Sequence, residues 1–317
     1  MVPRIIFMGT PAFAVPSLEA LKKLSDAGKI DLVAVVTTPD KKVGRKQQLQ
    51  ATPVKEYALT MGVKIVETNK VSDPRIVEKL TEMQPDLMLV VAFGQILPES
   101  LIQLPPFGTF NIHGSLLPRH RGASPVQASI LAGDSVGGIS LQKMVYQLDA
   151  GDVCFERRFP LDGTETTHQL MGVLARLGRD MVVNDLSRIW EGTAEYTVQD
   201  ESHVTFCGKI DKKSARLSPE IKDAILLDRE VRAYYSWPLS WMMFEGKRLQ
   251  IHQSIAYEDI VIPDTVALGE IFVQEEIPYI SCLGATALQL VTVKLEGKGI
   301  QSGQEFAKAY LLSSSRP

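Results

Sequence analysis

Cysteine is scarce in this sequence of 317 residues, and its three cysteines, Cys154, Cys207 and Cys282, are isolated from one another. An odd number of isolated cysteines does not build a disulfide framework. The CxxC and HExxH patterns of common zinc sites are missing as well. We therefore expect a protein without a bound metal that works in a reducing compartment, the cytoplasm.

Long apolar runs and a strong net charge are also missing. Residues 1–13 lack the basic start and long apolar core of a signal peptide, and no run approaches the length of a membrane span. The formal net charge of −3 provides no global basic field, so any contact with nucleic acid must use local patches. We expect no membrane association, and no sequence feature calls for an obligate protein partner.

The usual phosphate-binding motifs do not occur either. A strand over Arg4–Met8, a turn from Gly9, a helix over Ser17–Leu24 with Ser17 as its N-cap and a strand over Leu32–Thr37 predict a βαβ opening. Neither GxGxxG nor GxxxxGK[ST] accompanies it. A dinucleotide or a nucleoside triphosphate is therefore a poor first guess for the ligand.

The most informative stretch contains Asn111, His113 and Asp149. Residues 86–93 are apolar enough for a strand buried on both faces, and the next short strand carries Asn111 and His113 on one face. Side chains that finish a parallel strand lie in the crevice where α/β sheets bind ligands. Taken alone, such a pair is more often structural and Asp149 more often a turn residue. The turn could nevertheless return a carboxylate to His113.

The complete pattern is far more specific than its parts. Asn-x-His-x-Ser-Leu-Leu-Pro-x-x-x-Gly from Asn111, with Leu-Asp-x-Gly-Asp placing Asp149 36 residues after His113, resembles the folate-dependent formyltransferase family. This resemblance implies an α/β fold, in which a Rossmann-like, mostly parallel sheet domain precedes a smaller OB-like β-barrel. It also implies transfer of the formyl group of 10-formyltetrahydrofolate to the α-amine of methionine on initiator Met-tRNA, for translation initiation.

The three polar residues suit that chemistry, in which a neutral amine attacks the formyl carbon and negative charge builds on its oxygen. Asn111 can donate an amide N–H to this oxygen, and a protonated His113 can donate a charge-assisted one. One such donor is typically worth on the order of 10²–10³ in rate. Asp149 can orient the imidazole and help move a proton through water. Ser115 is not within a GxSxG motif, which lowers a serine-hydrolase interpretation.

The resemblance further implies a pocket for the pterin ring of a reduced folate, formed by two segments. An apolar slot with a few exposed backbone groups suits a flat pterin better than a phosphate. The predicted lining residues are Phe93, Gly94, Ile96, Leu97, Ser115, Leu116, Leu117 and Pro118.

Pro39–Pro53 is predicted to be a long basic loop without structure of its own, which makes it a candidate binding loop. Taken alone, such a charge run is usually a solvated face. Its sequence Pro-Asp-Lys-Lys-Val-Gly-Arg-Lys resembles the tRNA-contacting insertion of those family members that formylate methionyl-tRNA. The resemblance implies tRNA contacts by Lys41, Lys42, Gly44, Arg45 and Lys46.

Composition divides the chain into a catalytic domain over 1–190, a polar linker over 191–206 and a C-terminal domain over 207–317. Short segments separated by turn residues suggest a small barrel in the last part. They are Met242–Phe244, Arg248–Ile255, Gly269–Phe272, Tyr279–Cys282 and Leu288–Lys294. Trp237 and Trp241 are predicted to be core aromatics.

Some features depart from the family pattern. Ala12 stands where an acidic residue is common, and His120, predicted to be a solvated loop residue, stands where an aromatic is common. Residues 203–317 carry 13 Lys and Arg against 14 Asp and Glu, so a tRNA-binding face there must gather the positive charge on one side.

Two other functions stay open at this point. A formyltransferase acting on a sugar-nucleotide amine is one, and the basic loop with the barrel counts against it. A non-catalytic folate- or RNA-binding protein is the other, and the intact Asn111, His113 and Asp149 count against that.

Overall fold

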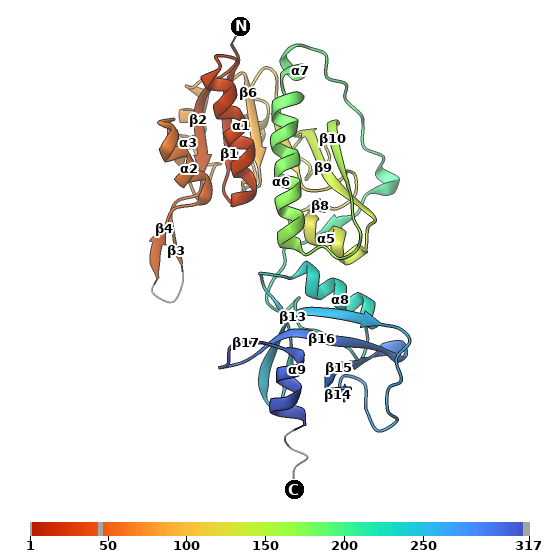
Figure 1. Ribbon diagram of the computed structural model, residues 1–317. Helices are drawn as coiled ribbons and strands as arrows, with labels where there is room; N and C mark the ends of the chain where they lie inside the picture. The colour runs from red at the N-terminus through yellow and green to blue at the C-terminus, as the bar shows by residue number, and fades with distance from the viewer. Residues whose placement is uncertain (1, 44–46, 313–317) are drawn as a thin grey trace. The chain divides into compact units, whose positions relative to one another are not determined.

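The computed structural model describes residues 2–43 and 47–312, which fold into two compact units. The first unit consists of the described residues within Met1–Pro125, Val136–Pro160 and Met171–Gly208, and the second of those within Val126–Ser135, Leu161–Leu170 and Lys209–Pro317. Helices and a mostly parallel sheet build the first unit, whereas antiparallel strands dominate the second (Figure 1).

A seven-stranded sheet with the order β10-β9-β7-β6-β1-β2-β5 forms the centre of the first unit. Its strands are β1 (Arg4–Gly9), β2 (Asp31–Thr37), β5 (Ile65–Glu67), β6 (Leu87–Val91), β7 (Thr109–His113), β9 (Val136–Lys143) and β10 (Val153–Pro160). The first five are parallel, and β9 and β10 pair antiparallel. The order reverses between β1 and β6, so the ligand crevice is expected beyond the carboxyl ends of these strands.

Helices of the first unit pack apolar faces on the sheet. They are α1 (Val15–Asp26), α2 (Pro53–Met61), α3 (Pro74–Thr81), α4 (Glu99–Ile102), most of α6 (Thr167–Asn184) and α7 (Ser187–Trp190), whereas nearly all of α5 (Pro125–Ala132) belongs to the second unit. Leu80 of α3 and Leu101 of α4 share a core cluster with Ile6 and Val90 of the sheet. All of β6 is buried, as its uninterrupted apolar sequence predicts. Over residues 2–43 and 47–312, no helix is long and apolar enough to cross a membrane.

The start of α1 differs from the prediction. This helix begins at Val15, with Pro16 in its first turn, and Ser17 lies buried inside it. The prediction of Ser17 as N-cap is therefore wrong, because the φ angle of Pro16 is already that of a helix and starts it earlier.

The basic segment after β2 also differs from the prediction. Instead of a loop without structure of its own, it forms an antiparallel hairpin of β3 (Lys41–Val43) and β4 (Gln48–Gln50). Lys41 pairs with Gln50 and Lys42 with Leu49, so the two strands satisfy part of each other's backbone. Gly44, Arg45 and Lys46 lie outside the described residues.

The second unit combines α8 (Ala224–Ala233) with a six-stranded antiparallel sheet. The strands are β12 (Ser240–Phe244), β13 (Lys247–Tyr257), β14 (Ile271–Gln274), β15 (Ile277–Cys282), β16 (Thr286–Leu295) and β17 (Ile300–Ser302), and α9 (Gly303–Phe306) follows them. Their order is β12-β13-β16-β15-β14, with β17 beside β16. A mostly parallel sheet followed by a smaller β domain confirms the predicted fold class.

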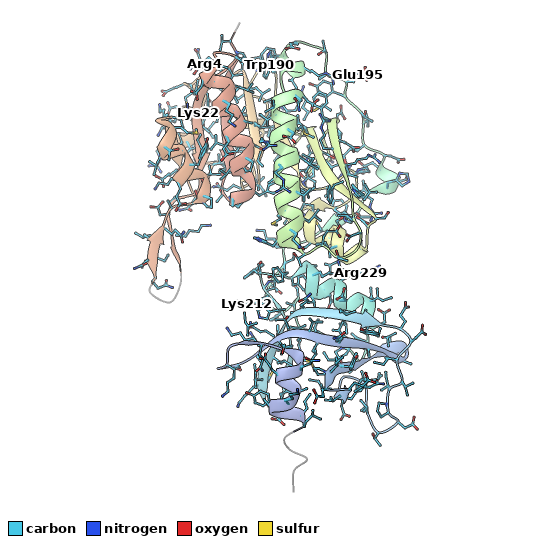
Figure 2. The ribbon with its side chains drawn as sticks, in the orientation of Figure 1. Arg4, Lys22, Trp190, Glu195, Lys212 and Arg229 are labelled. Carbon is cyan, nitrogen blue, oxygen red and sulfur yellow. The ribbon has the colours of Figure 1, made fainter. Side chains whose placement is uncertain are left out.

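Neither tryptophan of this unit lies in the core, so the prediction of two core aromatics is wrong. Trp237 is 54% exposed. Trp241 is half-buried, and its ring centroid lies 4.1 Å from the guanidinium carbon of Arg248 and 5.7 Å from that of Arg216. Its indole N–H donates to the backbone carbonyl of Lys212, at 3.3 Å. Lys212 is labelled in Figure 2. Cation–π contact and this hydrogen bond account for the position of the ring at the surface.

A buried carboxyl group underlies the pH dependence expected of the second unit. Glu230 on α8 is buried and is paired with Lys222, while its Oε2 has no hydrogen-bond partner among the described residues. Burial raises the pKa of Glu230 above its usual range, and the nearby Lys222 opposes that rise only in part. The folded protein therefore binds this proton more tightly than the unfolded chain does.

We expect Glu230→Gln to stabilise the protein at neutral pH. The wild-type carboxyl favours folding at low pH, and this contribution is lost as the pH rises through the elevated pKa. The melting temperature of the variant should exceed that of the wild type by on the order of 2 °C at pH 7.5, and the gap should close towards pH 4. Glu258→Gln, at an exposed position, is the matched control. A gap that widened in acid would contradict the assignment.

Candidate active site

Asn111 and His113 lie on β7, at the carboxyl edge of the parallel strands. β7 pairs with β6 on one side and antiparallel with β9 on the other, where Asn111 lies opposite Gln142 and His113 opposite Ser140. Both polar side chains therefore project from the same face, as the alternation predicts. Asn111 is half-buried and His113 is buried.

Asp149 returns to this pair through the turn that joins β9 to β10. Its Oδ1 lies 3.7 Å from His113 Nδ1 and accepts from Asn111 Nδ2 at 3.4 Å. The backbone of Asp149 has a φ of 49°, in the left-handed region that few non-glycine residues adopt. Gly151 makes the turn possible, because a Cβ there would lie 1.6 Å from the carbonyl oxygen of Lys143. The structure thus brings the three predicted catalytic residues together.

Two further hydrogen-bond donors to Asp149 are not predicted by the sequence. Gln142 Nε2 donates to Oδ1 at 2.8 Å, and the backbone N–H of Gly122 donates to Oδ2 at 2.8 Å. Gly122 has a φ of 124°, and a Cβ there would lie 2.1 Å from the carbonyl oxygen of Cys207. The glycine of the motif could have signalled this close approach, whereas no local pattern marks Gln142.

His113 is held from its other side as well. Its Nε2 lies 2.9 Å from the carbonyl oxygen of His120, and a carbonyl can only accept, so Nε2 carries a proton. Nδ1 faces Asp149. His120 is buried, with its backbone N–H donating to Thr205 Oγ1 at 2.8 Å, so the prediction of a solvated loop residue is wrong. Its positive φ of 59° turns the carbonyl towards the site.

The segment after α7 completes the site. β8 (Arg121–Gly122) pairs parallel with β11 (Phe206–Cys207), and Thr197 exchanges two backbone hydrogen bonds with Val153 of β10. Between these anchors, Gln199 is buried against the turn of Asp149. Composition alone had marked this stretch only as polar and broken.

The first predicted folate segment follows β6. Phe93 and Leu97 are buried in the core cluster of the sheet, whereas Ile96 is 81% exposed. Gly94 is exposed, with a φ of 79° and no atom within 4 Å of a Cβ built on it. Gln95 fastens this loop by accepting from Val71 N and donating to the carbonyl of Thr68, both at 2.7 Å. Side chain Ile96 and backbone Gly94 are therefore the parts that a flat ring could contact.

The second predicted folate segment follows β7. Ser115 and Leu117 are buried, Leu116 and Pro118 are half-buried, and the Leu117–Pro118 peptide is cis. Ser115 Oγ donates to the carbonyl of Arg119 at 2.6 Å, and Ser140 Oγ bridges the backbone of 115 and 117. Because β6 and β7 are neighbouring parallel strands, both segments lie at one edge of the sheet.

The environments of Cys154, Cys207 and Ser135 do not make any of these side chains a nucleophile. Burial raises the pKa of Cys154 to about 12 and also raises the pKa of Cys207, so both thiols stay protonated at neutral pH. A GxSxG sequence does occur at 133–137, but it joins the end of α5 to β9, the reverse of a strand-to-helix nucleophile elbow. Among the described residues, no group of three or more His, Cys, Asp or Glu could hold a metal ion.

The described part of the predicted tRNA-binding segment is exposed. Lys41 and Lys42 on β3 extend from the hairpin into solvent. Lys55 nearby in sequence is instead held by Asp40 at 2.6 Å and by Glu67 at 3.0 Å. The two hairpin lysines therefore remain accessible to phosphates.

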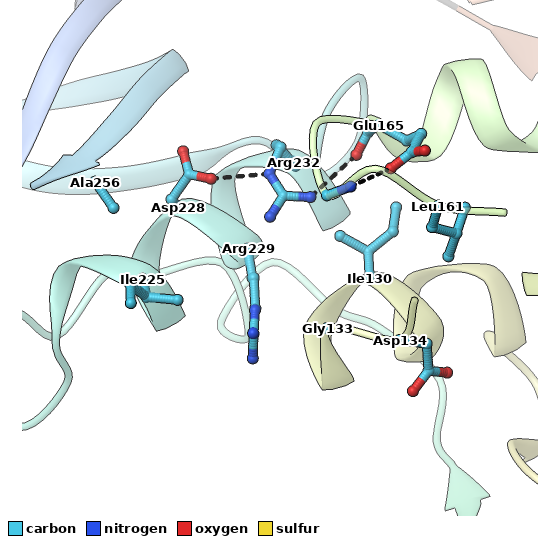
Figure 3. A pocket seen from close by; sticks show the side chains of 11 residues that line it. Ile130, Gly133, Asp134, Leu161, Glu165, Ile225, Asp228, Arg229, Arg232 and Ala256 are labelled. Carbon is cyan, nitrogen blue, oxygen red and sulfur yellow. Dashed lines mark hydrogen bonds and ion pairs between the residues drawn. The ribbon is translucent and has the colours of Figure 1, made fainter. Parts of the chain in front are cut away.

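A separate cavity of about 240 Å³ lies in the second unit (Figure 3). Arg232 on its wall donates to Asp228 at 2.8 Å and to the backbone carbonyl of Glu165 at 3.3 Å. The guanidinium of Arg229 approaches Gly133 closely, since a Cβ there would be 2.2 Å from the guanidinium carbon. The lining cations thus serve packing and local pairing, and none of the predicted site residues lines this cavity.

Comparison with known proteins agrees with the geometry. Residues 3–186 match the formyl transferase family and residues 209–311 its C-terminal domain. The methionyl-tRNA formyltransferase of Methylococcus capsulatus is 38% identical over 99% of both chains, and that of Myxococcus xanthus is 38% identical over 98% of this chain and 96% of the relative.

A solved structure shares the fold at lower identity. The N-formyltransferase of Helicobacter canadensis, in complex with folinic acid and dTDP-3-aminofucose, matches with a TM-score of 0.67 and 18% identity, over 92% of this chain and 99% of that one. Together with the curated relatives and the polar cluster at the sheet edge, these matches show that the chain belongs to the family of methionyl-tRNA formyltransferases.

Proposed function

We propose that this protein transfers the formyl group of 10-formyltetrahydrofolate to the α-amine of methionine on initiator Met-tRNA, in the cytoplasm. The observation that carries the proposal is the convergence of Asn111 and His113 on Asp149 at the carboxyl edge of the sheet. In this proposal residues 1–190 are the catalytic domain, 191–206 the linker and 207–317 the C-terminal domain.

Asn111 is the residue that meets the formyl oxygen first. It is half-buried, whereas the side chains of His113 and Asp149 are only 6% and 10% exposed. One N–H of its amide points to Asp149, and an asparagine amide has a second N–H to donate. That donor stabilises the negative charge that builds on the oxygen as the amine attacks.

His113 supplies the second stabilising group. Its ring is held between Asp149 and the carbonyl of His120, so its orientation is set before the reaction. With a proton on Nδ1 as well, the ring is a cation whose charge Asp149 balances at 3.7 Å. The positive charge of this fixed ring stabilises the negative charge that builds on the formyl oxygen.

Asp149 accepts, through water, the proton that the amine must lose. A C–N bond forms to the methionine nitrogen, the C–N bond to folate N10 breaks, and N10 takes up a proton in exchange. Asp149 is the acidic side chain within this cluster, and it can accept the proton through water and return it. No covalent bond to the protein is needed.

Acceptor recognition is assigned to positive charge. Lys41 and Lys42 on the exposed hairpin provide it in the first unit, together with Arg45 and Lys46 in the same segment. In the second unit, two arginines flank Trp241. Phosphate contacts by such residues position a nucleic acid and make its binding dependent on salt.

The catalytic assignment predicts that His113→Ala or Asp149→Ala lowers the single-turnover formylation rate by at least about 10²-fold, because both groups act on the transition state. The dissociation constant for Met-tRNA should change little. The exposed His168→Ala is the matched control and should react like the wild type. Rapid-quench assays with saturating 10-formyltetrahydrofolate measure the rates, and near-normal turnover in either site variant would refute the mechanism.

The donor assignment predicts that tetrahydrofolate raises the melting temperature while ATP and NAD do not. Preferential binding to the native state stabilises it by about 2.7 kcal/mol at 100 times Kd. Ile96→Asp should reduce the folate-induced shift, since it puts a charge where the ring would lie. Leu59→Asp, another exposed apolar position, should keep the shift. Protection by ATP without protection by folate would exclude the predicted donor.

The acceptor assignment predicts different results at two positions of the basic segment. Lys41→Ala should cause a modest loss of kcat/KM for Met-tRNA and reduce the salt slope of binding by about one unit. Arg45→Lys should lose much of the efficiency although the charge is kept, because lysine lacks the planar fork. Arg75→Lys, at an exposed position outside the segment, is the control. Assays at two salt concentrations separate these cases, and wild-type values for both variants would mean that the segment is merely solvated.

A further inference from the structure

Asp149 occupies a backbone conformation that its neighbours must enforce. A φ of 49° is costly for a residue with a side chain, and such strain persists only where surrounding contacts hold it. The direction of its carboxylate towards His113 depends on that conformation. Ala150 N donates to the carbonyl of Gln147 at 3.4 Å within the turn, and among the described residues the side-chain hydrogen bonds to its backbone come from one residue.

That side chain is Gln199, which is 7% exposed. Its Nε2 donates to the carbonyl oxygen of Asp149 at 2.8 Å and to that of Gly151 at 2.7 Å. One amide group therefore uses both of its N–H donors on two carbonyls of the same turn. The two bonds fix the turn on either side of Ala150.

The orientation of the Gln199 amide is itself fixed by Arg121. This arginine is 3% exposed, and its Nε donates to Gln199 Oε1 at 3.0 Å. Because a guanidinium can only donate, the amide oxygen must face Arg121 and the amide nitrogen must face the turn. Glu201 accepts from the far end of the guanidinium at 2.8 Å and balances its charge.

Backbone hydrogen bonds anchor the segment that carries Gln199 at both ends. Thr197 is bonded to Val153 through N–H and C=O, at 2.8 and 3.0 Å. Further on, the carbonyl of Thr205 accepts from Arg121 N at 2.8 Å, and its hydroxyl accepts from His120 N at 2.8 Å. The same segment thus supports the turn of Asp149 and the residue whose carbonyl holds His113.

We propose that Gln199 is a positioning residue for formyl transfer, which acts by fixing the turn that aims Asp149 at His113. This role rests on the proposed function. The hydrogen bonds of the Gln199 side chain all go to protein groups, so its loss should slow the chemical step and leave substrate affinity unchanged. Misplacement of a catalytic group by about 1 Å can cost on the order of 10²-fold in rate.

The test compares Gln199→Glu in two backgrounds. Glutamate has the same length and keeps the bond from Arg121, but it presents an oxygen where Nε2–H faced the two carbonyls. In the wild-type background the single-turnover rate should fall by about 10-fold or more, with KM for Met-tRNA within about 2-fold. In the Asp149→Ala background the same substitution should have no further effect, since it acts through that residue.

Val198→Ala, at the adjacent exposed position, is the matched control and should behave like the wild type. Gln199→Met, which adds no charge, replaces Gln199→Glu if the latter fails to fold. Equal rate losses in both backgrounds, or an unchanged rate in the first, would overturn the positioning role. Lack of formyl transfer by the wild-type protein would instead overturn the proposed function.

Discussion

The carboxylate of Asp149 is the point on which the rest of the site depends. Gln142 donates to one of its oxygens and the Gly122 backbone to the other, while Asn111 and His113 approach the first. Donors that come from different strands and point in different directions leave the carboxylate no freedom to turn. Charge that is fixed before the reaction avoids reorganisation during it, which is where much of the catalytic gain in acyl transfer arises.

The sheet supplies this geometry through register. The antiparallel pairing of β7 with β9 sets Asn111 opposite Gln142, and the turn that follows β9 then has only a short path back to the same edge. Two close backbone contacts, at Gly122 and Gly151, leave no room for any side chain. The chemistry of the site therefore constrains positions that touch no substrate, and an alanine at either glycine would displace the carboxylate.

Prediction from the sequence succeeded where the signal was local. The apolar run of β6 and the alternation that puts Asn111 and His113 on one face are properties of short windows, and the strands follow them. Gln142 lies only seven residues before Asp149, and it was missed because glutamine carries no pattern of its own. Gln199 was missed because its partners lie 48 to 78 residues away in the sequence. His120 was misassigned for the same reason, since its burial depends on Thr205, 85 residues away.

Positive charge in the second unit is grouped locally although the composition of this unit is near neutral. Residues 256–276 hold six acidic residues and no Lys or Arg, yet Arg216 and Arg248 both lie against Trp241. Exposed charges farther apart than about 8 Å are largely screened at physiological salt, so the acidic stretch cancels a basic cluster only where the two are close. Net charge is therefore a poor guide to this unit. The local grouping of the charges matters more. Backbone hydrogen bonds between Trp241 and residues 215 and 217 create this grouping, because they hold Arg216 beside the strand of Trp241.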